Sequence, residues 1–208
     1  MVNRSVSNYD LARDKAAREF AQCDIVPMVK KYGLKQDSQY TYISFLRNDY
    51  RISRETGRVE LLRGDAPPVH AGFNESLTIF DVLGYAKKDA ALSGEFCSVM
   101  DLKGVAKSAN PGGDMYKKFA QHFAGRSDDL RKACEALGGA AYPVGEVAYQ
   151  IPLFNFLPVI LQFWDADEEF GAQLTVKWDT NTLDFMHFET TFYAAGCFME
   201  RLIRLSNP

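Results

Sequence analysis

The order in which two kinds of hydrophobic periodicity follow one another constrains the fold of this chain most. Segments of strand type, with a period of two residues, are gathered at residues 40–62 and 147–178, and segments of helix type lie before, between and after them. Alternating strand–helix–strand units favour a parallel sheet, whereas strands in separate blocks favour antiparallel pairing. The sequence therefore predicts an α+β fold, in which an antiparallel sheet from an N-terminal meander and a C-terminal hairpin packs against several helices.

The N-terminal part carries recognisable start, stop and turn residues. A helical segment is expected over residues 7–33, with Ser7 or Asn8 as the N-cap. Within this segment, Pro27 is expected either to break the helix or to open a second short one. The meander is then expected to have strands at 40–45, 50–53 and 59–62, followed by a loop at 64–68.

The rest of the chain is divided by glycine- and proline-rich breakers. The strongest is the Asn-Pro-Gly-Gly run at 110–113, which is expected to be a flexible surface loop. Gly138 and Gly139 are expected to end a helix. The expected elements are a helix from 74 or 76 to about 86, a short strand or extended link at 96–100, helices at 115–123 and 128–137, strands at 147–151, 158–164 and 173–178, and a last helix at about 187–205.

Length, composition and charge limit the classes of protein and of partner. With 208 residues and a mass of 23.4 kDa, the chain suits one domain covering 1–208. Hydrophobic residues make up 47% and charged residues 25%, which excludes a disordered or collagen-like chain. The net charge of −3 offers no large positive field, so neither nucleic acid nor a membrane surface is expected as a partner.

Cysteine usage and apolar runs indicate a cytoplasmic location. The four cysteines are widely spaced and contain no Cys-x-x-Cys pair, so free thiols in a reducing compartment are expected rather than a zinc or iron–sulfur site. The N-terminal residues lack the apolar core of a signal peptide. No apolar run approaches the roughly 20 residues of a membrane span. No metal site and no cofactor are assigned.

Motifs of the common enzyme classes are missing. The sequence contains no phosphate-binding GxxxxGK[ST] loop, no GxGxxG, no GxSxG nucleophile elbow and no HExxH. Only three histidines are present, which leaves few ways to build a histidine-centred triad. These observations weaken the familiar enzyme classes, and no catalytic residue is assigned.

An acidic turn between two apolar strands is the most distinctive local feature. Its carboxylates lie within five residues and are flanked by aromatic side chains. Such a cluster could bind a hard cation, but Phe170 and Val176 occupy the positions where an EF-hand needs glycine and glutamate. The alternatives are a solvated turn that keeps the hairpin soluble, or a carboxylate that caps local backbone N–H groups. The candidate ligand-binding residues here are Trp164, Asp165, Asp167, Glu168 and Glu169.

Three further candidates lie close to this turn in sequence. Trp178 could form an aromatic wall with Trp164, although large aromatic residues on adjacent strands more often belong to the core. Similarly, His187 and Glu189 at the start of the last helix could contact a ligand. The alternative for His187, which we favour, is that it organises the N-terminus of the helix.

Several segments spread over most of the chain carry a resemblance. They are Leu137-Gly-Gly139, the strand 158–164, the turn 167–170, Lys177-Trp-Asp179, Phe185 to Glu189, Tyr50 to Ser53 and Leu92 to Phe96. These segments are similar to an uncharacterised family, catalogued as domain of unknown function 3786. The resemblance covers about residues 10 to 205, and the Asp-Glu-Glu-Phe turn is its most specific motif. It implies a bacterial or archaeal, mostly anaerobe-associated protein with no assigned activity and no established catalytic residues to carry over.

Some members of that family carry an added cysteine-rich iron–sulfur domain, of the sort found with corrinoid and one-carbon enzymes. The resemblance therefore implies a non-catalytic accessory module that binds a small molecule or a partner protein in redox or one-carbon metabolism. The alternative hypothesis is a carboxylate-based enzyme, with or without a divalent cation, acting at the acidic turn. A homodimer is a third possibility, because aromatic residues lie on more than one side of the last helix.

Overall fold

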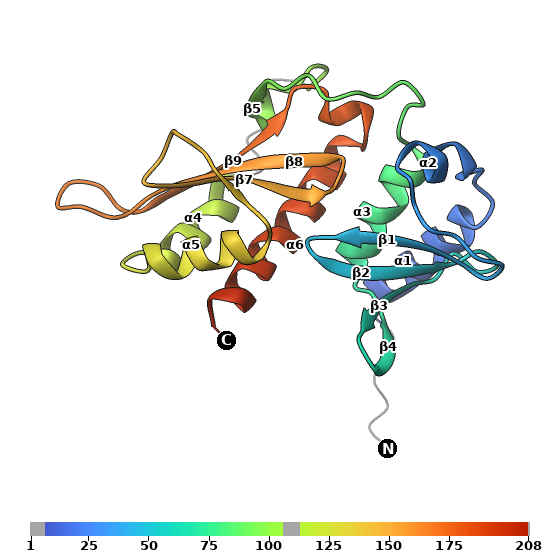
Figure 1. The fold of residues 1–208 in the computed structure, drawn as a ribbon. Coiled ribbons are helices and arrows are strands. Elements are labelled where there is room, and N and C mark those ends of the chain that lie inside the picture. Colours follow the sequence, from blue (N-terminus) through green and yellow to red (C-terminus); the bar gives the residue numbers. More distant parts are fainter. Residues whose placement is uncertain (1–6, 106–112, 208) are drawn as a thin grey trace.

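The computed structural model describes residues 7–105 and 113–207, and for residues 113–115 it describes the backbone alone. The chain forms a four-stranded and a five-stranded sheet, both antiparallel, with helices between and around them (Figure 1). The predicted α+β class is therefore confirmed. The N-terminal meander and the C-terminal hairpin belong to different sheets, which the sequence pattern did not distinguish.

Two helices precede the first sheet and begin where their capping residues predict. Helix α1 (Asn8–Phe20) starts after Ser7, whose side chain accepts from the backbone N–H of Asp10 while the Asp10 carboxylate accepts from Ser7. Helix α2 (Val26–Lys31) carries Pro27 in its first turn, so the proline opens a second helix. Gly33, with φ of +61°, ends this region.

The first sheet is a meander with one more strand than predicted. Its strands β1 (Tyr40–Phe45), β2 (Asn48–Ser53), β3 (Val59–Arg63) and β4 (Ala66–His70) lie in sequence order. The prediction of a loop at 64–68 was wrong, because strand β4 begins at Ala66 and includes Pro67 and Pro68. Proline lacks the N–H that an interior strand must donate, and β4 tolerates it as an edge strand that pairs only with β3.

The second sheet contains the predicted C-terminal strands. Its order is β5 (Phe96–Ser98), β9 (Gln173–Asp179), β8 (Leu157–Trp164), β7 (Val147–Phe154) and β6 (Ala140–Ala141). On β9, Leu174, Val176 and Trp178 are buried while the residues between them are more exposed, as the alternation predicts. This face of β9 contributes to the core beneath helix α4.

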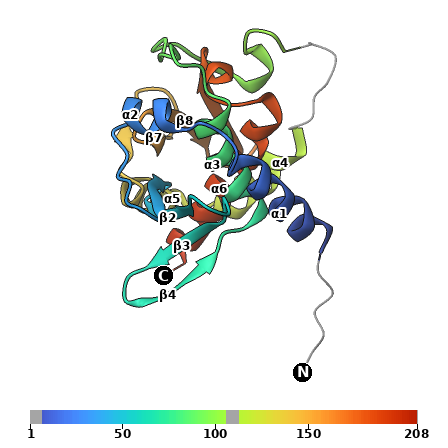
Figure 2. The ribbon, with the colours of Figure 1, turned by 90° about the vertical axis from the view of Figure 1, so that its right-hand side faces the viewer.

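Helix α6 joins the two halves of the molecule. Helices α3 (Phe73–Gly84), α4 (Gly113–Phe123), α5 (Ser127–Ala136) and α6 (Phe188–Ser206) are connected by loops and by the short 3₁₀ turns η1 (Val99–Asp101) and η2 (Thr182–Asp184). Along its length α6 packs against α3 on one side and α5 on the other, so it lies between the sheets (Figures 1 and 2). Its aromatic Phe198 is fully buried within the chain, and Phe188 and Phe192 pack against the same core.

The two sheets meet at the β1–β2 turn. The N–H of Leu46 donates to the carbonyl of Leu153 at 2.8 Å, which ties this turn to β7. Nearby, the rings of Phe45 and Phe154 stack with centroids 4.7 Å apart. Buried residues from both halves form one continuous core. The relative position of the two sheets is therefore fixed by packing and by a backbone hydrogen bond.

Two remaining sequence expectations concern loops and membrane spans. Most of the Asn-Pro-Gly-Gly run lies outside the described residues, and its last residue, Gly113, begins α4. Within residues 7–105 and 113–207, none of the helices combines the length and the apolar character that crossing a bilayer requires.

Candidate functional site

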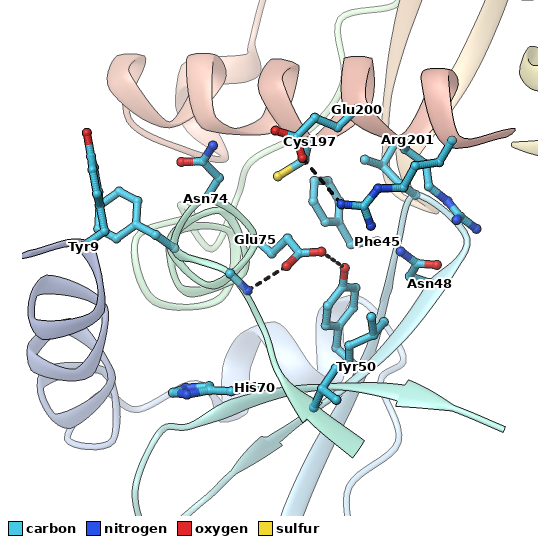
Figure 3. Close-up of a pocket in the computed structure, with 16 residues that line it drawn as sticks. Tyr9, Phe45, Asn48, Tyr50, His70, Asn74, Glu75, Cys197, Glu200 and Arg201 are labelled. Atoms are coloured by element: carbon cyan, nitrogen blue, oxygen red, sulfur yellow. Dashed lines mark hydrogen bonds and ion pairs between the residues drawn. The ribbon is translucent and has the colours of Figure 1, made fainter. Parts of the chain in front are cut away.

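A cleft of about 580 Å³ opens where the first sheet, the start of α3 and the C-terminal half of α6 come together (Figure 3). The cleft combines aromatic walls with convergent polar groups, which is the usual composition of a small-molecule site. Residues far apart in sequence supply it. The lining residues are Tyr9, Phe45, Leu46, Asn48, Tyr50, Leu61, Val69, His70, Gly72, Phe73, Asn74, Glu75, Cys197, Glu200, Arg201 and Arg204.

A carboxylate–phenol pair is fixed inside the cleft. Glu75 lies in the first turn of α3, where its Oε2 accepts from the backbone N–H of Gly72 at 2.7 Å. Its other oxygen accepts from the Tyr50 hydroxyl, also at 2.7 Å. Burial, aided by the charge of Glu75, raises the pKa of Tyr50, so this phenol stays protonated and donates. Both carboxylate oxygens of Glu75 are thereby held by donors of the protein.

The opposite wall is one face of α6. Cys197, Glu200, Arg201 and Arg204 follow one another at spacings of three, one and three residues, which places all of them on the same side of a helix. Figure 3 shows Cys197, Glu200 and Arg201 extending from α6 on the side of the helix that faces Glu75 and Tyr50. Burial raises the pKa of the Cys197 thiol, which therefore stays protonated at neutral pH.

Arg201 differs from the other charged residues of this wall. Its Nε atom is buried and makes no hydrogen bond within the described part of the chain. Arg204, in contrast, lies 3.9 Å from the Glu200 carboxylate in an exposed pair. A buried N–H without an acceptor loses hydration and receives nothing in return, so this Nε is the most conspicuous unsatisfied group among the described residues of the cleft.

Aromatic side chains line the end of the cleft next to α1. The Phe73 ring has edge-to-face contacts with Tyr9 and Tyr193, each with centroids 5.4 Å apart. Tyr9 remains 69% exposed, so this wall is open to solvent. Burial, and after it the charges of Arg13 and Arg58, lowers the pKa of His70, so this histidine is neutral at pH 7. His70 therefore adds no positive charge to the aromatic end of the cleft.

None of the candidate ligand-binding residues named from the sequence lies in this cleft, although Tyr50 begins one of the motifs of the family resemblance. The signal that could have pointed to it is the polar stripe from Cys197 to Arg204 on a helix otherwise rich in apolar residues. Glu75 has a purely local explanation as a capping residue near the start of α3. The combination of these residues follows only from the packing of α3 and α6, which the sequence pattern does not reveal.

The acidic turn forms the β8–β9 connection, as predicted, and extends away from the body of the molecule (Figure 1). Glu168 and Glu169 are exposed. Asp167 accepts from the backbone N–H groups of Phe170, at 2.6 Å, and Glu169, at 2.8 Å, and these bonds lower its pKa. A general base requires a raised pKa, so the geometry of Asp167 favours the local capping alternative.

Asp165 also interacts with backbone, but in a distant part of the chain. Its carboxylate accepts from the N–H of Gly125, at 2.9 and 3.0 Å, and from the Ser127 hydroxyl at 3.2 Å. These hydrogen bonds lower the pKa of Asp165, and the bond from Gly125 has the largest effect. The carboxylate thus holds the turn between α4 and α5 against the end of β8. No group of three or more metal-binding side chains is placed to hold an ion in the described residues.

We expect Asp165→Ala to lower the free energy of unfolding by about 1–2 kcal/mol at pH 7, because Gly125, Ser127 and the neighbouring backbone N–H of Ala166 lose their acceptor. The folded-state pKa lies below the unfolded value near 4, so this stabilisation is present above about pH 4 and is lost as the pH falls further. Urea unfolding at pH 7 and at pH 3 measures both effects. Glu169→Ala, at an exposed carboxylate of the same turn, is the control; an equal loss in both variants would contradict this role.

The two tryptophans lie at opposite ends of the paired strands. Trp164 pairs with Gln173 and is 38% exposed, whereas Trp178 pairs with Val159 and is 1% exposed. They therefore do not form a common aromatic wall, and Trp178 belongs to the core. Trp164 borders a shallow depression at the acidic turn, together with Phe170.

His187 occupies the N-cap position of α6, where Asp81 of α3 fixes it. One oxygen of Asp81 accepts from the His187 backbone N–H at 2.7 Å, and the other lies 2.8 Å from Nδ1 of the ring. The ring packs on Tyr85 with centroids 3.6 Å apart. This arrangement agrees with the interpretation that His187 organises the helix N-terminus. Glu189 is exposed in the first turn and does not contact the cleft described above.

The family of the chain follows from a comparison with known protein families. A family model described as domain of unknown function (DUF3786) matches residues 24–201, which include the meander, most of the cleft and most of α6. The chain belongs to this family. The resemblance inferred from the sequence motifs is thereby confirmed. Comparisons with curated proteins and with solved structures give no match.

Proposed function

We propose that this DUF3786 protein is a non-catalytic accessory module of the cytoplasm whose small-molecule ligand occupies the cleft between the meander and α6. The observation that carries the proposal is Arg201, a partly buried cation whose Nε has no hydrogen-bond partner among the described residues, in a cleft of about 580 Å³. Pockets of this size, with aromatic walls and fixed polar groups, are typical of ligand sites.

The redox or one-carbon context belongs to the proposal and rests on the family resemblance described above. A module of this kind recognises its ligand and presents it to another protein, which would explain why the sequence lacks familiar catalytic motifs. A partner protein and a homodimer remain predictions, and light scattering of the purified protein tests the dimer directly.

Native mass spectrometry of freshly purified protein, with an absorbance spectrum of the same sample, tests the proposed site. We expect a small molecule to remain bound to the wild type and to be lost from Val69→Trp. Val69 lines the cleft opposite α6 and is 36% exposed, so an indole there reduces the space without burying a new group in the core.

The control is Val144→Trp, which introduces the same side chain at a valine that is 52% exposed and outside the cleft. We expect this variant to retain the bound molecule. The proposal fails if the wild type carries no molecule and no cofactor absorbance, or if both tryptophan variants bind as the wild type does.

A further inference from the structure

We infer that the ligand of this cleft carries an oxyanion, a carboxylate or a phosphate, that pairs with Arg201. The inference rests on the proposed function and adds the chemical class of the ligand. It follows from which groups of the cleft already have partners and which do not.

The two carboxylates that line the cleft, Glu75 and Glu200, already have partners. Glu75 receives hydrogen bonds from Tyr50 and Gly72 at both of its oxygens, so it has little need of a donor from a ligand. Glu200 is exposed to water and lies within 3.9 Å of Arg204. A cationic ligand would therefore find, among the described residues of this cleft, no carboxylate that lacks a partner.

Unlike these carboxylates, the Arg201 side chain of the cleft has a donor that lacks a partner among the described residues. The Nε atom of Arg201 is buried without a hydrogen bond, and no carboxylate of the described residues forms an ion pair with this side chain. His70 is neutral, so it does not compete for an anion. A guanidinium presents its N–H groups in a planar fork that matches the two oxygens of a carboxylate or phosphate. Pairing with an oxyanion is the interaction that this group lacks.

The rest of the cleft suits an apolar or aromatic body. Phe73 and Tyr9 form one end, and Leu61 and Val69 pair across β3 and β4 beside it. Aromatic rings offer a large contact area at a low cost in conformational entropy. We therefore use aryl compounds of different charge as probes for the ligand class.

Calorimetric titration with phenyl phosphate, phenylacetate and benzylamine at constant ionic strength tests the inference. We expect the wild type to bind at least one of the two anions and to bind benzylamine about tenfold more weakly or not at all. Which anion binds better distinguishes a phosphate from a carboxylate. Stronger binding of benzylamine than of either anion would overturn the inference.

Arg201→Met keeps much of the length of the side chain and removes the charge, so we expect it to weaken anion binding about tenfold or more. Arg201→Lys should retain part of the affinity, because it keeps the charge but not the fork. Arg18→Met, at an exposed arginine of α1, is the matched control and should bind as the wild type does.

The failure of this inference can be told apart from failure of the proposed function. If the molecule that co-purifies is lost from Val69→Trp but retained by Arg201→Met, the cleft is the site and the ligand does not depend on Arg201. If neither variant affects it, the site lies elsewhere and both proposals fail. Thermal unfolding of each variant shows that it is folded before binding is compared.

Discussion

Replacing Trp178 by alanine is expected to lower the free energy of unfolding by about 3–5 kcal/mol, as for other large buried aromatic residues. Trp178 is 1% exposed and lies on the inner face of β9 with Leu174 and Val176, beneath α4. Alanine would leave a cavity that the surrounding sheet and helix cannot fill without moving. Urea unfolding followed by far-ultraviolet circular dichroism measures this loss.

Two further variants serve as controls for the loss of stability expected of Trp178→Ala. Trp178→Phe should lose less, since phenylalanine retains most of the buried apolar surface. Glu168→Gln, at an exposed position of the acidic turn, should stay within about ±0.5 kcal/mol of the wild type. A tolerated Trp178→Ala beside a strongly destabilising Glu168→Gln would reverse the assignment of core and surface.

Asp179→Ala is expected to have a comparable effect, about 3–5 kcal/mol, for a different physical reason. Asp179 is fully buried at the end of β9, and its carboxylate accepts from the backbone N–H groups of Ser93, Gly94 and Asn181 at 2.9–3.1 Å. Alanine would remove the acceptor and leave these donors without partners. The loop before β5 would then lose the two hydrogen bonds by which Ser93 and Gly94 attach to the end of β9.

Asp179→Asn is the matched control for Asp179→Ala. Its single amide oxygen can serve some of the donors, while its NH₂ group would face another N–H, so we expect an intermediate loss. Urea unfolding gives the free energies, and amide hydrogen exchange at Gly94 and Asn181 reports the local bonds. Unchanged stability of Asp179→Ala, with unchanged protection of both amides, would contradict the account.

Local sequence rules predicted the elements whose determinants are themselves local. Ser7 with Asp10 is a capping box, and Pro27 is compatible with the first turn of a helix, so both helix starts follow from neighbouring residues. The alternation on β9 likewise identified the buried face. Strand β4 was not predicted, because Pro67 and Pro68 argue against a strand unless that strand is known to lie at the edge of a sheet. The edge position depends on how the whole sheet is assembled.

The candidate site was not predictable in the same way. The cleft combines Tyr50, Glu75 and Arg201, which only the packing of the meander and α3 against α6 brings together. The acidic turn attracted attention because its charges are adjacent in sequence. Its Asp165 carboxylate proves to hold Gly125, which is 40 residues away and gives no sign of this contact in the sequence.

A crystal structure of the protein as purified, without added ligand, tests the central claim most directly. We predict electron density for a small molecule in the cleft between Arg201 and the Phe73 ring, with an oxyanion against the guanidinium. Density for a bound molecule at the acidic turn, with only water in the cleft, would contradict the proposed site.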